Sequence, residues 1–269
     1  MYICINFSKK FNAFRLYVIK NNINFKFNAM NKKFFLPIAA VLVITATFLS
    51  CQKDNEDGNK VKLLKFARYN SSGSFDRYEY DTQNRLTTIS GYSYNVLSST
   101  LTLTYSGNDL IGFGDYTLTM VDYTQSTYKF TFSNGIKTFI YDLNSDGTLA
   151  KMTSDNLETH FQYQNGNLTK ITSEWSNEQI GFVKTTNEYT YDSRNSPFLN
   201  CKTPIWWLIG VLENYQSCIN NITEDTWTSN ELSGTTVYTY EYDNEGYPTK
   251  LRAMYGNQNA SETFFSYNE

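Results

Sequence analysis

The sequence predicts an all-β fold: a curved antiparallel meander or barrel-like sheet of many short hairpins, with one short helical insert near 203–215. Aromatic and polar residues alternate along segments such as 128–132 and 238–242, and a period of two places alternate side chains on opposite faces of a strand. A hairpin phrase recurs along the chain, and long helical periodicity is nearly absent. These three features favour short strands joined by tight turns.

The recurring phrase is an aromatic strand, a polar turn and a second strand that opens with Leu-Thr or a similar pair. Asn-Gly, Asp-Gly or Gly-Asn in the turn supplies the positive φ that a tight hairpin needs. The copies are unevenly spaced, so they predict a meander in which each hairpin pairs with the next, not a solenoid of fixed period. A sheet of about a dozen or more strands is expected to curl or close, because a long open sheet exposes its edges. The copies cover 78–89, 140–152, 161–171 and 240–251, with a weaker one at 103–111.

One segment interrupts the hairpins and predicts the helical insert. A further copy begins at Tyr189 and stops at Pro197. Thr203 as N-cap with Pro204 in the first turn is a helix start, and an apolar run follows. We expect a short apolar helix that plugs or covers one end of the sheet; a buried loop is the alternative.

The first fifty residues differ in charge from the rest of the chain. They contain seven Lys or Arg and no Asp or Glu, whereas the whole chain has 23 basic and 26 acidic residues and a net charge of -3. Without those seven, 16 basic residues face 26 acidic ones, so the part after Ser50 carries about -10. This acidic balance and the lack of basic clusters predict that the chain has no nucleic-acid partner.

Residues 30–50 have the pattern of a lipoprotein signal peptide. A short basic start at 30–33 precedes an apolar run over 34–48 and a small residue before Cys51. The run of about 15 residues is shorter than the roughly 20 that a membrane-spanning helix needs. The stretch Phe-Leu-Ser-Cys at 48–51 resembles the lipobox of bacterial lipoproteins, with Phe where Leu, Val or Ile is usual. We expect lipid on the Cys51 sulfur as the membrane attachment; an ordinary signal peptide with an incidental cysteine is the alternative.

The segments that flank the signal peptide complete the predicted organisation. Residues 1–29 fit no part of an export signal, and we interpret them as a mis-assigned leader before a true start at Met30. Residues 51–60 form a polar, acidic tether. This tether resembles the Lys-acidic signal of surface-exposed lipoproteins of the Bacteroidota, which implies a lipid-anchored position on the outer membrane facing the cell exterior. Residues 61–269 then form the antiparallel β domain.

The order of motifs in 61–269 resembles a family. The hairpin phrase looks like the YD repeats of Rhs-type proteins. The fuller resemblance is to Bacteroidota lipoproteins of a domain-of-unknown-function family with a porin-like fold. It is carried by Tyr-Asp and Asn-Ser-Pro-Phe over 191–198, Asn-Asn-Ile-Thr at 220–223 and Gly-Tyr-Pro-Thr-Lys at 246–250. The resemblance implies a curved, barrel-like antiparallel sheet and no established activity. "Porin-like" here describes shape, because short strands and a lipid tether do not indicate a membrane pore.

The sequence offers few residues for catalysis or metal binding. The single histidine, His160, lies in a predicted strand, and no G-x-S-x-G motif accompanies it, so no catalytic residue and no cofactor is predicted. Zinc sites need His/Cys clusters, which are lacking. Asp142, Asn144 and Asp146 match the opening of a calcium loop, but the twelfth position is Thr153 where an EF-hand needs Glu. A hairpin turn is the favoured interpretation, and a weak calcium site is the alternative.

Two further groups of residues carry open alternatives. Cys201 and Cys218 flank the predicted helix, and in an oxidising setting they either form a disulfide or remain two free buried thiols. Tryptophan rings could stack on sugars, although core packing is the favoured interpretation for each. The candidates for ligand stacking are Trp175, Trp206, Trp207 and Trp227.

Three functions follow, in order of preference. The first is a non-enzymatic surface lipoprotein, a binding or structural module of unknown ligand. The second is a glycan-binding accessory of an outer-membrane uptake system, with a polysaccharide or outer-membrane protein as partner. The third is a hydrolase that uses a carboxylate pair not apparent from spacing. Exposed Trp or Tyr in a groove would favour the second, and two carboxylates across a cleft the third.

Overall fold

The computed structural model describes residues 61–70, 73–123, 128–177, 181–212, 218–230, 232–256 and 260–268. The predicted leader, signal peptide, Cys51 and tether lie outside these residues. Lys60–Glu269 form one compact unit. In the part of the chain that the structure describes, no helix combines the length and apolarity needed to cross a membrane.

The described unit contains sixteen strands and a short helix. Pairing is antiparallel throughout, and each strand pairs with its neighbours in the sequence. The elements are β1 (Leu64–Tyr69), β2 (Ser74–Tyr80), β3 (Leu86–Ser93), β4 (Val96–Ser106), β5 (Asp109–Phe113), β6 (Tyr116–Tyr123), β7 (Tyr128–Ser133), β8 (Thr138–Leu143), β9 (Leu149–Ser154), β10 (Leu157–Gln164), β11 (Asn167–Asn177), β12 (Gly181–Tyr191), α2 (Ile205–Gly210), β13 (Ile222–Ser229), β14 (Leu232–Tyr242), β15 (Pro248–Tyr255) and β16 (Ser261–Tyr267).

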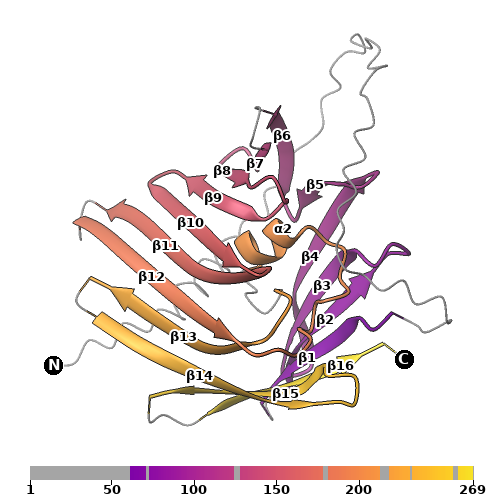
Figure 1. Cartoon of the computed structure of the whole chain (residues 1–269). Coiled ribbons are helices and arrows are strands. Elements are labelled where there is room, and N and C mark those ends of the chain that lie inside the picture. The colour runs from indigo at the N-terminus through magenta and orange to yellow at the C-terminus, as the bar shows by residue number, and fades with distance from the viewer. Residues whose placement is uncertain are drawn as a thin grey trace. The chain divides into compact units, whose positions relative to one another are not determined.

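The sheet closes into a barrel because the first strand pairs with the last. β1 and β16 lie side by side, with Ala67 opposite Phe265 and Tyr69 opposite Thr263 (Figure 1). Closure leaves no unpaired sheet edge. The predicted all-β fold is confirmed, and of its two forms the structure has the closed barrel.

The predicted hairpin turns are present with the predicted backbone chemistry. Gly147, Gly166 and Gly246 have φ of 81°, 76° and 82°, in the turns after β8, β10 and β14. The turn between β2 and β3 has no glycine, and there Asn84 takes φ of 63°. Asn tolerates this left-handed region better than other side chains because it hydrogen-bonds locally.

The insert is a helix, and it lies inside the barrel. Trp207 is 6.0 Å from Phe113 of β5, and Trp206 stacks 5.6 Å from Phe130 of β7, measured between ring centroids. Leu208 and Ile209 are buried as well. The helix therefore fills the barrel near the end where the turns after β2, β8 and β10 lie, as a plug does.

The helix start differs from the prediction. The N-cap position is Pro204, and no side chain caps the helix. The hydroxyl of Thr203 instead accepts a hydrogen bond from the backbone N–H of Leu86, 2.7 Å away. Thr203 therefore ties the insert to β3. The described helix covers Ile205–Gly210, within the predicted span of 203–215.

The outer wall of the barrel carries cross-strand ion pairs beside exposed apolar side chains such as Val237, Met254 and Phe264. Oppositely charged side chains pair across neighbouring strands, at 2.7 Å for Lys170–Glu188, 2.7 Å for Lys184–Glu174 and 2.9 Å for Lys250–Glu262. The alternate positions of the same strands point inward and include buried residues such as Ile171 and Leu251. The interior around α2 is thus apolar, and the outer wall combines charged and apolar side chains.

Candidate functional site

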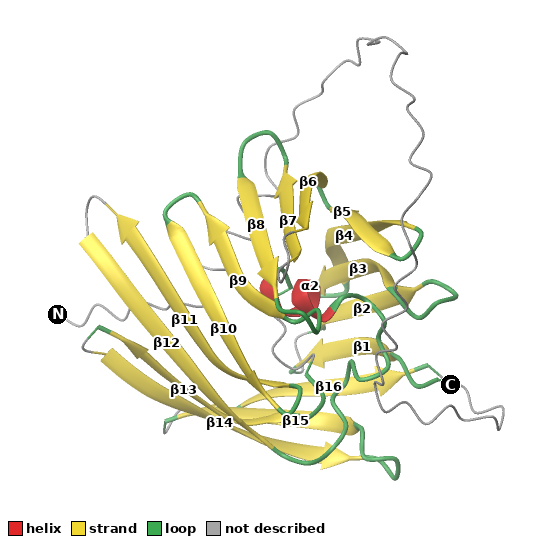
Figure 2. Cartoon of the chain, turned by 45° about the horizontal axis from the view of Figure 1, so that its top comes forward, coloured by secondary structure: helices red, strands yellow, loops and turns green. Residues whose placement is uncertain are grey.

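The inner wall changes character with distance from the helix. Next to α2 the inward side chains are buried, as with Leu168 at 0% and Tyr189 at 5% exposure. The long strands β10–β14 extend away from the helix (Figures 1 and 2). Along that stretch the inward side chains are mixed: Val183 and Ser229 are each 7% exposed, whereas Asn187, Asp225 and Trp227 are only partly buried. Tyr255, at the end of the neighbouring β15, is 40% exposed. The barrel is therefore filled at one end, and its inner wall is accessible to solvent towards the other.

Polar and aromatic side chains from four neighbouring strands gather on this accessible wall. Asp225 lies opposite Tyr189 on one side and Thr236 on the other, and Thr236 lies opposite Tyr255. Tyr189 belongs to the core, so the whole row faces inward. We call these residues the inner-wall patch: Asn187 of β12, Asp225 and Trp227 of β13, Gly234, Thr236 and Tyr238 of β14, and Ala253 and Tyr255 of β15.

Asp225 is the charged group of the patch. Its Oδ1 accepts a hydrogen bond of 3.0 Å from the Asn187 Nδ2. Burial raises the pKa of the Asp225 carboxyl above its ordinary value, and the hydrogen bond from Asn187 opposes that shift. Burial, followed by the nearby Asp225 charge, raises the pKa of Tyr238 to about 12. The patch thus contains a partly desolvated carboxylate beside a neutral phenol.

Gly234 makes room for two polar aromatic edges. A Cβ at this position would lie 2.6 Å from the Tyr255 Oη and 2.8 Å from the Trp227 Nε1. The indole N–H and the phenol O–H therefore converge on one point above the glycine backbone. Any side chain at 234 would displace them.

A β-bulge explains why sequence reasoning missed Asp225. Tyr191 pairs with Ile222 but Thr190 pairs with Glu224, so β13 carries one extra residue. Strict alternation from the buried Ile222 would place Glu224 inward and Asp225 outward. The bulge reverses the faces for the rest of the strand. Nothing in the local sequence marks the bulge.

The structure separates the four predicted stacking residues into two pairs. Trp206 and Trp207 are 5% and 0% exposed in the core around α2. Their rings pack against Phe113 and Phe130, which is the core packing that the sequence favoured over ligand stacking. Trp175 and Trp227 are partly exposed on the inward face, opposite Val183 and Asn187 respectively.

Cys201 and Cys218 are both free thiols, the second of the two states that the sequence left open. Cys218 is buried and accepts the backbone N–H of Leu168 at 3.3 Å. Burial raises the pKa of both thiols, so the thiol form dominates at neutral pH.

The residues of the calcium motif make hydrogen bonds within the hairpin turn. The Asp146 Oδ1 accepts hydrogen bonds from the backbone N–H and hydroxyl of Thr148, and the Asn144 Nδ2 donates to the same hydroxyl at 2.9 Å. Asp142 lies 3.8 Å from Lys151. Over the residues that are described, no group of three His, Cys, Asp or Glu could hold a metal ion.

His160 lies on the outer wall. Its side chain is 49% exposed, and its Nε2 is 2.6 Å from Glu158 on the same strand. A surface contact of this kind contributes little to stability.

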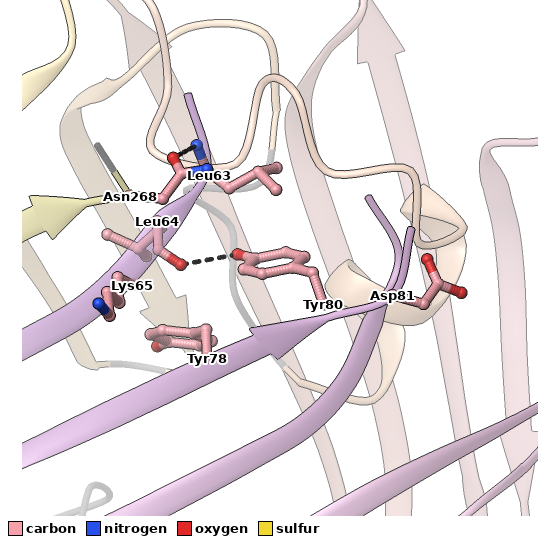
Figure 3. A pocket seen from close by; sticks show the side chains of 7 residues that line it. All are labelled: Leu63, Leu64, Lys65, Tyr78, Tyr80, Asp81 and Asn268. Atoms are coloured by element: carbon pink, nitrogen blue, oxygen red, sulfur yellow. Dashed lines mark hydrogen bonds between the residues drawn. The ribbon is translucent and has the colours of Figure 1, made fainter. Parts of the chain in front are cut away.

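A pocket of about 290 Å³ lies where the barrel closes (Figure 3). Two hydrogen bonds join its walls: the Tyr80 hydroxyl donates to the Leu64 carbonyl at 2.9 Å, and the Leu63 N–H donates to the Asn268 Oδ1 at 2.7 Å. These contacts join the first strand to the second strand and to the C-terminus. The pocket belongs to the closure seam and lacks the convergent polar groups of the inner-wall patch. It is lined by Leu63, Leu64, Lys65, Tyr78, Tyr80, Asp81 and Asn268.

Comparison with known proteins gives similar solved structures, among them two porin-like proteins. No family model matches the chain, and no curated protein does. A porin-like protein from Bacteroides vulgatus ATCC 8482 is 13% identical with a TM-score of 0.43, over 77% of this chain and 99% of that one. A porin-like protein from Bacteroides uniformis ATCC 8492 is 17% identical with a TM-score of 0.37, over 76% and 96%.

Proposed function

We propose that this chain is an outer-membrane-anchored surface lipoprotein of the Bacteroidota type, whose barrel acts as a non-enzymatic binding module. One observation carries the binding role: the barrel is plugged by α2 at one end and presents a solvent-accessible polar and aromatic inner wall towards the other. Ligand sites commonly combine an aromatic lining with a few convergent polar groups. The membrane attachment rests on the lipobox at Cys51.

The charged outer wall argues that the barrel stands in water and that lipid is its only membrane contact. Lys170, Lys184 and Lys250 lie on outward faces of three different strands. A Lys on the lipid face of a membrane barrel costs about 2–4 kcal/mol near the bilayer midplane. Membrane barrels instead present a continuous apolar band to the lipid, without charged side chains of this kind.

Metabolic labelling with a palmitate analogue tests the anchor. The full chain should incorporate label, Cys51→Ala should lose it, and Cys201→Ala should keep it as the matched cysteine control. Equal labelling of the full chain and Cys51→Ala would overturn the lipoprotein assignment.

A glycan-binding accessory role is the second candidate. The partly exposed Trp175 and Trp227 on the inner wall favour it, because sugar rings stack on aromatic faces. A glycan array probed with the protein, alongside Trp227→Ala, tests this role. Binding that is lost in the variant supports it; silence across polysaccharides rejects it.

The hydrolase hypothesis gains little from the inner wall. Two carboxylates face inward on the described strands, Asp76 of β2 and Asp225 of β13. Five strand spacings separate β2 from β13 around the closed sheet, about 24 Å along the wall at about 4.8 Å per strand. Asp76 already accepts a 2.6 Å hydrogen bond from Tyr69. Hydrolysis assays on any glycan that binds test this hypothesis directly.

A further inference from the structure

We propose that the inner-wall patch binds the ammonium group of a small organic cation, with Asp225 as the counter-charge and with Trp227 and Tyr255 beside it. This inference rests on the proposed function, which makes the accessible end of the barrel its binding surface. It adds the chemical class of the ligand and the residues that would hold it.

The first argument is the unbalanced charge. The only hydrogen bond to Asp225 comes from the neutral Asn187 amide, and among the described residues no Lys, Arg or His forms an ion pair with it. The lysines of the surrounding strands pair with glutamates on the outer wall, as Lys184 does with Glu174. Carboxylates removed from water are normally paired with a cation. Here a cation from solution would supply the missing charge.

Burial has already raised the pKa of the Asp225 carboxyl. A bound ammonium group would act in the opposite direction and hold the carboxyl ionised. A bound cation would thus stabilise the charged form of the desolvated carboxylate.

The second argument is the aromatic surround. Trp227 lies two positions after Asp225 on the same face of β13 and opposite Gly234. Its Nε1 and the Tyr255 Oη both lie within 2.8 Å of the point where a Cβ on Gly234 would be. Aromatic rings within about 6 Å attract ammonium ions through their negative faces. Thr236 lies between Asp225 and Tyr255 in the row, and Ala253 is the partner of Tyr238.

The same residues discriminate against other ligand classes. An anion would be repelled by Asp225, and no described cation of the patch would offset that repulsion. A neutral polyol could accept from the Trp227 indole N–H, but it would leave the carboxylate without a counter-charge. The cation is the class that satisfies both the charge and the rings.

Calorimetric titration of the full chain in a non-ionic detergent tests the proposal. The probes are choline and n-butylammonium, with 3,3-dimethylbutan-1-ol as the uncharged isostere of choline. We expect at least one of the cations to bind at least about tenfold more tightly than the alcohol. Asp225→Asn should weaken that binding by at least about tenfold, and Gly234→Ala should weaken it by displacing the two aromatic edges.

The matched control is Glu224→Gln, which removes one carboxylate from the neighbouring outward position. It should bind like the parent chain. Circular dichroism and thermal melting establish that each variant is folded, and Asp225→Asn keeps the size and the hydrogen-bond acceptor of the side chain.

Binding of neither ammonium probe, equal affinity for cation and alcohol, or undiminished binding by Asp225→Asn would each overturn the inference. The proposed function fails separately. If a glycan binds in a Trp227-dependent way and neither ammonium probe binds, the proposed binding module is supported and the cation proposal is rejected. If Cys51→Ala and the full chain incorporate equal palmitate label, the lipoprotein proposal is rejected, whatever the result with the ammonium probes.

Discussion

Asp225 illustrates how one side chain can weaken the fold in order to build a site. Its carboxylate faces the barrel interior with an amide as partner, and burial raises its pKa. A carboxyl with a raised pKa in the folded state stabilises the fold only when it is protonated. Its charge is therefore a cost at neutral pH that removal of the charge would relieve.

We expect Asp225→Asn to raise the free energy of unfolding at neutral pH. The sign follows from linkage: the penalty is fully present above the folded pKa and disappears as the pH falls below the unfolded value. The stability difference between Asp225→Asn and the parent should thus be constant around neutral pH, and it should shrink only as the pH falls through the folded pKa towards the unfolded value. Urea unfolding from pH 8 to pH 3 measures it. A difference that grows on acidification would mean that the carboxyl is stabilised in its charged form.

The two classes of tryptophan should respond differently to truncation. Trp207 is 0% exposed between α2 and β5, so Trp207→Ala leaves a cavity and should cost about 3–5 kcal/mol. Trp227→Ala on the partly exposed wall should cost clearly less, because solvent can fill the space. Denaturant midpoints of the two variants give the comparison. Equal costs would contradict the division of the barrel into a filled and an accessible end.

At the scale of elements, the helix is held by close packing and not by its ends. It is six residues long and has no side-chain cap. Isolated helices of this length are unstable in water, so the contacts of Trp206, Trp207 and Gly210 with the barrel must hold it. Gly210 approaches closely: a Cβ there would lie 2.6 Å from the Leu149 Cδ2.

We expect Gly210→Ala to destabilise the fold by about 1–3 kcal/mol through overpacking, although Ala is about 1 kcal/mol the better helix former. A double-mutant cycle with Leu149→Ala separates the two effects. In the Leu149→Ala background the contact is gone, so Gly210→Ala should become neutral or stabilising. An equal loss in both backgrounds would show that the Leu149 contact is not the cause.

The hairpins were predictable and the face of β13 was not, for a physical reason. The positive φ values at Gly147, Gly166 and Gly246 depend only on neighbouring residues, so the turn residues in the sequence predict them. The bulge opposite Thr190 depends on the pairing of two strands that are about thirty residues apart. No residue type in the sequence indicates it. The inward position of Asp225, and with it the candidate site, therefore required the structure. Core packing of Trp206 and Trp207 was the favoured interpretation from the sequence, but their partner rings depended on where the helix docks.

At the scale of the whole molecule, closure depends on contacts between the two ends of the barrel unit. The Asn268 side chain accepts the Leu63 N–H at 2.7 Å and donates to the Val61 carbonyl at 3.0 Å. These residues are about 200 positions apart, so no local pattern predicts their pairing. The sequence predicted a sheet that curls or closes but could not distinguish between those two outcomes.

Asn268→Ala should loosen this seam and lower the free energy of unfolding by about 1–3 kcal/mol, since two hydrogen bonds of about 0.5–1.5 kcal/mol each are lost. Ser266→Ala, on the exposed outer face of β16, is the control and should have little effect. Amide hydrogen exchange should show faster exchange in β1 and β16 for Asn268→Ala alone. Unchanged protection there would mean that the strand ladder closes the barrel without the Asn268 contacts.

The distribution of charge predicts how the barrel as a whole meets a membrane. Its outward lysines and glutamates form ion pairs across the strands, whereas its aromatic residues fill the interior around α2. At about 2–4 kcal/mol for each Lys near the bilayer midplane, three such residues alone would cost roughly 6–12 kcal/mol in lipid. That is comparable with the whole stability of a typical domain.

We therefore expect residues 61–269, freed of the lipidated segment, to give a β-sheet circular dichroism spectrum and cooperative unfolding in detergent-free buffer. They should also leave planar bilayers without conductance. A requirement for detergent to reach the β-sheet state, or stepwise channel currents, would show that lipid and not water surrounds the wall.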